Sequence, residues 1–201
     1  MKLYFSPGAC SLAPHIVARE LGLDLEIERV DLAGKKTASG EDFWAINPKG
    51  YVPALRLDDG QVLTENPAVL QYLAERGSGL VPPAGSFERS RLTEMLAFIN
   101  SEIHKTWSAL FNPKILPEVR EERIAHLKKR YQLVDQWLTG KQYLLGDQFT
   151  VADAYLYVVT SWATMLKVDL GELPALQAFV ERVGARPAVQ AARKAESGAK
   201  A

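Results

Sequence analysis

The residue with the clearest chemical potential in this sequence is its single cysteine, Cys10. Cys10 follows a short apolar stretch, Leu3 to Phe5, and immediately precedes a predicted helix start at Ser11. Backbone N–H groups and the positive end of the helix dipole lie at such a start, so they stabilise a thiolate and lower the thiol pKa below about 8.5. Two interpretations of Cys10 follow, a reactive thiol or a small buried apolar side chain.

A second candidate is the pair Val52-Pro53 at the start of a predicted strand. Proline is tolerated there because it donates no hydrogen bond to the sheet. A cis bond would turn the N–H and C=O of Val52 outward, where an extended peptide can pair with them. The alternative is an edge-strand proline without a chemical role.

Three polar side chains could hold the charged ends of an amino acid or peptide. Glu65 and Asn66 stand at a predicted helix start, where exposed N–H groups suit a carboxylate and the acid of Glu65 suits an ammonium group. Asn66 could equally be the N-cap of that helix, with Pro67 at its first position. Lys35 could bind a second carboxylate or be an ordinary surface lysine.

Short strand-like and helical segments would position these residues. Within the first 78 residues the order predicts a β-α-β unit over 2–32 and, after a further helix, a β-β-α unit over 52–76. The turn residues Asp58-Asp59-Gly60 mark the tip of the hairpin in the second unit. The first part of the chain is therefore expected to be an α/β domain, β-α-β-α-β-β-α, over 1–78.

Beyond a Gly- and Pro-containing linker at 79–86, the sequence favours helices only. Apolar side chains keep helical spacing from Leu92 to Leu110 and again from Ile124 to Leu138. Thr150 and Asp153 form a predicted capping box at the start of an apolar helix. We therefore expect an all-helical domain over 87–201, with frayed residues from Glu196 onward.

Composition excludes several classes of protein. The chain is 47% hydrophobic and 24% charged, with a formal net charge of zero, so no nucleic-acid or polybasic membrane surface is expected. The longest uncharged stretch, Ala154 to Leu166, is shorter than the roughly 20 residues of a membrane span. A single cysteine and the lack of a secretory signal pattern favour a cytoplasmic protein.

In this order, the motifs resemble those of the cytosolic glutathione S-transferases. The segments that carry the resemblance are Tyr4-Phe5-Ser6-Pro7-Gly8-Ala9-Cys10-Ser11, Asn47-Pro48-Lys49-Gly50-Tyr51-Val52-Pro53, Thr64-Glu65-Asn66 and Phe149-Thr150-Val151-Ala152-Asp153. The Pro-Gly-Ala-Cys-Ser opening and Glu102-Ile103-His104-Lys105 resemble the bacterial beta class in particular. The resemblance implies a thioredoxin-like N-terminal domain, an all-α helical-bundle C-terminal domain, a homodimer, and glutathione as co-substrate without a metal.

By this resemblance, the first domain would hold most of the glutathione molecule. Glu65 and Asn66 would bind the γ-glutamyl end, and Lys35 would meet the glycyl carboxylate. Val52, before a cis Pro53, would pair with the cysteinyl backbone.

The resemblance also implies where the glutathione sulfur would lie. Cys10 would face it, with Ser11 nearby, and His104 would be the third catalytic residue. Ser101 and Glu102 would complete the pocket beside His104, which could otherwise be a histidine at the edge of the core.

The implied reaction is activation of the glutathione thiol and its conjugation to a small hydrophobic electrophile. The electrophile pocket would be lined by apolar side chains such as Trp107, Phe111 and Trp162. One alternative is a mixed disulfide between Cys10 and glutathione, as in a thiol transferase, peroxidase or reductive dehalogenase. Another is a non-catalytic binding module of the same fold.

Overall fold

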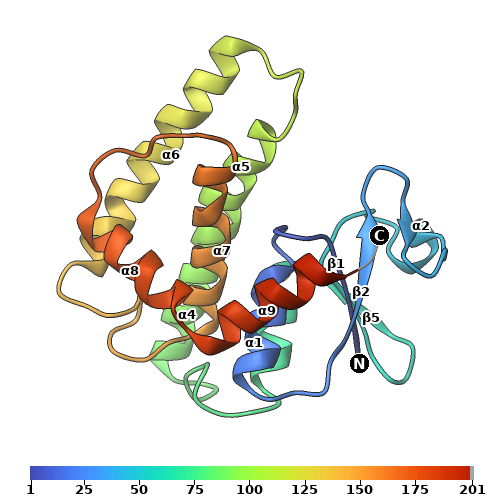
Figure 1. Ribbon diagram of the computed structural model, residues 1–201. Helices are drawn as coiled ribbons and strands as arrows, with labels where there is room; N and C mark the ends of the chain where they lie inside the picture. Colours follow the sequence, from blue (N-terminus) through green and yellow to red (C-terminus); the bar gives the residue numbers. More distant parts are fainter. Residues whose placement is uncertain (200–201) are drawn as a thin grey trace. The chain divides into compact units, whose positions relative to one another are not determined.

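The computed structural model describes residues 1–199, which form two compact units (Figure 1). The first unit is Met1–Val81 together with the chain from Ala185 onward, and the second is Pro82–Gly184. This division differs from the expected boundaries at the end of the chain, because α9 (Pro187–Gly198) packs against α1 (Leu12–Glu20) of the first unit. As limits of functional domains, 1–78, 79–86 and 87–201 stay a prediction.

A five-stranded mixed sheet forms the centre of the first unit. Its strands, in the order β3-β2-β1-β4-β5, are Lys36–Thr37, Glu26–Asp31, Lys2–Phe5, Ala54–Arg56 and Val62–Thr64. β1 pairs in parallel with β2, and the other neighbours are antiparallel. The predicted order of strands and helices is confirmed. The additional strand β3 is 2 residues long, too short to show a periodic pattern.

The helices of this unit complete its core. α2 (Phe43–Ile46) contributes Phe43 to an apolar cluster. The other buried members are Tyr4, Val30, Val52 and Ala54. α1 packs against α3 (Asn66–Ala74) as well as α9. In Figure 1 the red helix α9 accordingly runs beside the blue helix α1.

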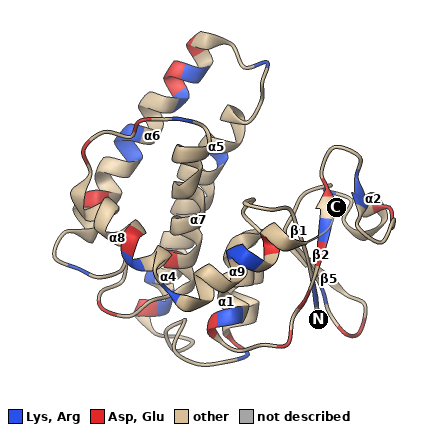
Figure 2. Ribbon diagram, viewed as in Figure 1, with Lys and Arg blue, Asp and Glu red and all other residues tan. Residues whose placement is uncertain are grey.

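The second unit is built from helices. In chain order they are α4 (Phe87–Phe98), η1 (Ile99–His104), α5 (Lys105–Leu110), α6 (Pro117–Leu138), α7 (Val151–Met165) and α8 (Pro174–Gly184). α6 carries many charges of both signs, whereas α7 is almost free of charged residues and mostly buried (Figure 2). The predicted capping box of Thr150 and Asp153 is present at the start of α7.

The helix predicted over 92–110 is continuous, but its middle is not α-helical. η1 is a single π-helical segment between α4 and α5, with the sequence INSEIH. Such turns are rare and occur frequently at functional sites. No described helix combines the length and the apolar character that crossing a bilayer requires.

The expected fraying from Glu196 onward is wrong for Glu196 itself, which is buried within α9. Its carboxylate lies 3.1 Å from His15 Nδ1 and accepts a hydrogen bond from the Gly8 N–H at 3.3 Å. These partners belong to α1 and to the loop before it, so sequence position alone could not reveal them. Residues 200 and 201 lie outside the described part of the chain.

Candidate functional site

Cys10 lies in the loop between β1 and α1, next to the start of α1. Its side chain is buried, and Sγ donates a hydrogen bond to the carbonyl oxygen of Val52 at 3.2 Å. The peptide bond between Val52 and Pro53 is cis. Two segments that the sequence singled out separately therefore meet at the thiol.

Burial determines the protonation of this thiol. It raises the pKa of Cys10 to about 12, although the backbone N–H groups of Cys10 and Ser11 favour the thiolate. The negative charges of Glu65 and Glu196 act in the same direction as burial. The predicted lowering of the Cys10 pKa is therefore wrong. Desolvation of the thiolate raises the pKa by more than the hydrogen bonds from the helix start lower it.

Ser11 is fully buried, and its hydroxyl is engaged within its own loop. Oγ accepts a hydrogen bond from the Ser6 N–H at 3.2 Å and donates one to the Ser6 carbonyl at 3.4 Å. The side chain thus closes the turn that carries Cys10. Its backbone N–H is the group that lies toward the Cys10 thiol.

Asn66 connects the start of α3 to the Cys10 loop. Its Nδ2 donates to the carbonyl oxygen of Cys10 at 3.0 Å, and the side chain is buried. The predicted N-cap role of Asn66 is wrong, since Glu65 occupies the N-cap position and Asn66 is the first residue of α3. Asn66 Oδ1 is buried without a hydrogen-bond partner, a condition that costs about 1–3 kcal/mol and favours a donor from a ligand.

Glu65 is exposed and has a positive φ of 70°. Its Oε1 accepts a hydrogen bond from Lys49 Nζ at 2.7 Å, and the same ammonium group donates to Thr64 Oγ1 at 2.9 Å. The carboxylate proposed for an ammonium ligand is therefore held by a cation of the protein. Lys49 was not singled out from the sequence, although it lies in the quoted 47–53 motif.

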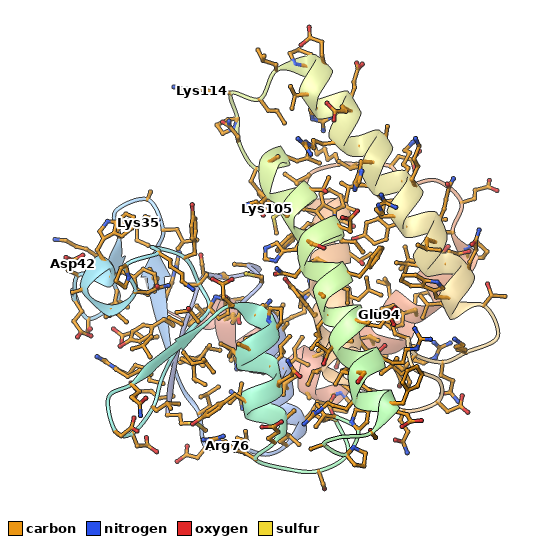
Figure 3. All side chains as sticks on the ribbon, turned by 180° about the vertical axis from the view of Figure 1, so that it is seen from behind. Lys35, Asp42, Arg76, Glu94, Lys105 and Lys114 are labelled. Atoms are coloured by element: carbon orange, nitrogen blue, oxygen red, sulfur yellow. The ribbon has the colours of Figure 1, made fainter. Side chains whose placement is uncertain are left out.

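Lys35 is more constrained than an ordinary surface lysine. Its Nζ donates to the Gly50 carbonyl at 2.8 Å and lies 5.3 Å from the Trp44 ring and 5.6 Å from the Tyr51 ring. The Lys35 carbonyl accepts from the Phe43 N–H at 2.9 Å, next to Asp42, and Figure 3 labels Lys35 and Asp42 on this part of the unit. Lys35 thus contacts the segment that leads into Val52.

In the second unit, Ser101, Glu102 and His104 all belong to η1, the segment directly before Lys105 in Figure 3. Ser101 Oγ donates back to the Ala97 carbonyl at 3.0 Å. The three side chains bond to different helices: Ser101 to the backbone of α4, Glu102 to α6 and His104 to α7.

Glu102 bonds to α6, where its Oε2 lies 2.8 Å from Arg130 Nε and 3.3 Å from His126 Nε2. His104 bonds to α7, where its Nδ1 lies 2.5 Å from the hydroxyl oxygen of Tyr155. Glu102 therefore bonds to one neighbouring helix and His104 to another, although both lie in η1.

His104 belongs to a chain of polar groups that the sequence did not reveal. The Tyr155 hydroxyl donates to Asn100 Oδ1 at 2.9 Å, and the Trp162 ring centre lies 5.1 Å from that of His104. The sequence could have indicated Asn100, because it lies four residues before His104 on the same helix. It could not have indicated Tyr155, because a tyrosine in an apolar helix is typical of the core.

Of the aromatic residues expected beside an electrophile, Trp107 already has its polar group bonded within the helical unit. It is fully buried and donates from Nε1 to the Tyr131 hydroxyl at 2.9 Å. Phe111 is partly exposed and packs edge-on against Trp162, with ring centres 5.2 Å apart. Of this pair Phe111 is exposed and Trp162 is buried, and the lining of an electrophile pocket by these three residues stays a prediction.

Within residues 1–199, no group of three or more His, Cys, Asp or Glu side chains comes together in a way that could hold a metal ion. The donors and acceptors of the first unit instead suit an extended, charged organic molecule. Lys35 bonds to Gly50 in the segment that leads to Val52, Asn66 bonds to the Cys10 carbonyl, and Glu65 directly precedes Asn66.

Comparison with known proteins gives the same picture over nearly the whole chain. The glutathione S-transferase N-terminal domain family matches residues 8–76, and the glutathione S-transferase C-terminal domain family matches residues 98–187. Glutathione S-transferase GstA of Escherichia coli O157:H7 is 44% identical over 198 residues, which cover 98% of this chain and 98% of GstA.

Solved structures agree with these sequence relationships. A sphingomonad glutathione S-transferase complexed with glutathione is 48% identical, with a TM-score of 0.95 over 99% of this chain and 100% of that chain. The bacterial beta-class glutathione S-transferase of Sphingomonas chungbukensis is 44% identical, with a TM-score of 0.94 over 98% of both chains. The expected fold class and the resemblance to the beta class are confirmed. The chain belongs to the glutathione S-transferase family.

Proposed function

We propose that this protein is an enzyme that binds glutathione, stabilises its sulfur as a thiolate and conjugates it to small hydrophobic electrophiles. The observation that carries the proposal is that Val52 and Asn66, from two separate segments, each form a hydrogen bond with Cys10. Family membership and the sphingomonad relative complexed with glutathione support the choice of ligand.

Each end of glutathione has a complementary group in the first unit. The γ-glutamyl ammonium would be bound by Glu65, sharing that carboxylate with Lys49, and Asn66 Oδ1 would accept a hydrogen bond from the same end. The glycyl carboxylate would meet the ammonium of Lys35. The cysteinyl backbone would pair with Val52, next to the Cys10 loop.

Thiolate formation requires about 1.4 kcal/mol of preferential stabilisation for each unit by which the thiol pKa falls. The N–H groups at the start of α1 supply part of it by favouring negative charge. The resulting thiolate attacks an electrophilic carbon, a carbon–sulfur bond forms, and the leaving group departs with the bonding electron pair. From the second unit, we propose that His104, Ser101 and Glu102 complete the glutathione pocket. We propose that Phe111 and Trp162 line the pocket of the electrophile.

The redox alternative depends on a reactive Cys10, because a mixed disulfide forms by attack of a thiolate on a disulfide sulfur. The raised pKa of Cys10 weighs against it, since the protonated thiol is the poor nucleophile. A non-catalytic module of the same fold is disfavoured by the joint presence of Cys10, Lys35, Glu65 and His104.

Assembly and location belong to the same proposal. We propose a homodimer by analogy with the family. We also propose a cytoplasmic location, because a single cysteine suits a reducing compartment. The proposed reaction uses glutathione as co-substrate and needs no metal, nucleic acid or membrane.

The test is a pair of measurements on the native protein and Cys10→Ala. Intact mass is recorded after incubation with oxidised glutathione, and initial rates of glutathione conjugation are recorded with a chromogenic aryl halide. We expect turnover by the native protein, little adduct, and conjugation retained within about tenfold in Cys10→Ala. A glutathione adduct that is absent in Cys10→Ala, with no conjugation by either protein, would overturn the proposal in favour of redox chemistry.

A further inference from the structure

The polar chain formed by His104, Tyr155 and Asn100 lies entirely within the second unit. Tyr155 comes from α7 and is completely buried, whereas the other two residues come from η1. One phenol therefore contacts two side chains of the same π-helical segment, at 2.5 Å from His104 Nδ1 and 2.9 Å from Asn100 Oδ1.

The direction of these hydrogen bonds follows from the number of protons available. A tyrosine hydroxyl has one proton, and the amide oxygen of Asn100 can only accept. The Tyr155 proton is donated to Asn100, so the phenol oxygen must accept from His104. In this arrangement Nδ1 of His104 carries a hydrogen, and the lone pair of the neutral imidazole lies on Nε2.

The surroundings of the ring hold this arrangement in place. Tyr155 and Trp162 pack edge-on against His104, with ring centres 5.7 Å and 5.1 Å away. Turning the imidazole over would remove the donor that Tyr155 needs inside a buried environment, at a cost of about 1–3 kcal/mol. The orientation and the tautomer are therefore coupled.

We propose that Asn100 and Tyr155 are positioning residues that fix His104 in its Nδ1–H tautomer and so make Nε2 a proton acceptor. The inference rests on the proposed function for its chemical consequence. In the step it implies, the S–H bond of glutathione breaks, the proton passes to Nε2, and the electron pair stays on sulfur. His104 becomes an imidazolium, which returns the proton to water after conjugation.

This assignment gives His104 a definite role in the proposed reaction. A neutral His104 held as the Nδ1–H tautomer cannot donate from Nε2 to a thiolate, but it can remove the thiol proton. Only after that transfer does Nε2 carry a hydrogen that can be donated to the new thiolate. Positioned general bases contribute typically about 10²–10⁴-fold to a rate.

The test is the ¹⁵N spectrum of the imidazole rings in the full-length labelled protein without glutathione. The chain has only three histidines, so His104→Gln assigns the signals of His104. We expect Nδ1 of neutral His104 to show the shift of a protonated nitrogen and Nε2 that of a nitrogen with a lone pair. The opposite pattern in the native protein overturns the proposal.

Variants separate positioning from general structural support. Tyr155→Phe and Asn100→Leu should convert the His104 signals to a mixture of tautomers, whereas Asn100→Asp keeps an acceptor oxygen and should retain the native tautomer. Ser108→Ala is the matched control, since Ser108 is exposed and its hydroxyl donates to the backbone carbonyl of His104 rather than to the imidazole. Retention of the native tautomer in both Tyr155→Phe and Asn100→Leu would also overturn the proposal.

Kinetics distinguish this proposal from the proposed function. Tyr155→Phe should lower kcat roughly 10- to 100-fold with little change in the KM for glutathione. A native protein with the Nδ1–H tautomer but no turnover would contradict the proposed function while supporting the positioning of His104 by Asn100 and Tyr155. Normal turnover together with the Nε2–H tautomer would contradict this positioning alone.

Discussion

The Cys10 thiol donates a hydrogen bond to the carbonyl oxygen of Val52, 3.2 Å away, from within a buried environment. A carbonyl acceptor stabilises the protonated thiol and repels a thiolate, so this contact and burial act in the same direction. Cys10 therefore connects the loop before α1 to the segment around Pro53. In the reaction that we propose, activation of glutathione is therefore assigned to other groups, namely the backbone N–H groups at the start of α1 and His104.

Cys10 should be nearly inert to alkylation in the folded protein. With its pKa raised to about 12, only about one thiol in 10⁴ or fewer is ionised at neutral pH. Modification by a haloacetamide, followed by intact mass, should be slower than in denaturant by several orders of magnitude. Equal or faster modification of the folded chain would show that Cys10 is an activated thiol after all.

Glu65 should contribute to glutathione binding without stabilising the fold. Glu65→Gln removes a charge-assisted hydrogen bond worth about 1.5–3 kcal/mol, so the KM for glutathione should rise roughly 10- to 100-fold. Its ion pair with Lys49 is largely exposed, so the free energy of unfolding should change by less than about 1 kcal/mol.

Lys49→Gln is the matched control for this prediction. It breaks the same ion pair but leaves the carboxylate of Glu65 in place for the ligand. Its KM for glutathione should stay within about threefold of the native value. If the two variants raise KM equally, Glu65 does not contact glutathione and the pair acts only through local structure.

Glu196 should stabilise the first unit by attaching α9 to α1 and its preceding loop. Glu196→Ala removes the buried carboxylate that faces His15 Nδ1 and accepts from the Gly8 N–H, so the free energy of unfolding should fall by about 3 kcal/mol. Chemical denaturation measures this change. Lys194→Ala, an exposed change in the same helix, should alter it by less than about 0.5 kcal/mol. Equal effects of the two substitutions would contradict this role of Glu196.

Asp153 should make stability depend on pH in an uncommon direction. Burial raises the pKa of its carboxyl from 3.8 to about 6, although Thr150 and the Leu144 N–H donate to it. The folded state therefore binds a proton between these pH values that the unfolded state has released, and the contribution of Asp153 falls as pH rises from about 4 to 6.

Denaturation of the native protein and Asp153→Asn at several pH values tests this sign. The variant does not titrate at this position, so the difference in unfolding free energy isolates Asp153. We expect the native protein's advantage to shrink by about 3 kcal/mol between pH 4 and pH 7. An advantage that grows with pH would mean that the hydrogen bonds outweigh burial and lower the pKa instead.

The strands, helices and capping box could be predicted because a pattern of a few neighbouring residues indicates each of them. β1 and α1 show their period and their boundaries within a few residues, and Thr150 with Asp153 needs only three residues of separation. The positions of Cys10, Val52 and Asn66 in one site came from resemblance to a family rather than from such patterns. Their mutual contacts depend on how three segments pack.

The errors share one physical origin, which is packing between segments that lie apart in the sequence. A helix start lowers a thiol pKa only when water can reach the sulfur, and the sequence around Cys10 does not report that. The N-cap prediction for Asn66 rests on a local property, whereas the partner of its side chain is the distant Cys10 carbonyl. The charged Glu196 suggested fraying, yet it meets His15 and Gly8 from the far end of the chain.

The most direct measurement is the pH dependence of the ultraviolet thiolate band of glutathione bound to Cys10→Ala, which removes the protein's own thiol. We expect bound thiolate with an apparent pKa clearly below the roughly 8.5 of a free cysteine thiol, and conjugation rates that follow the same titration. Glutathione that binds but keeps a pKa at or above that value, or a protein that does not bind it, would contradict the central claim.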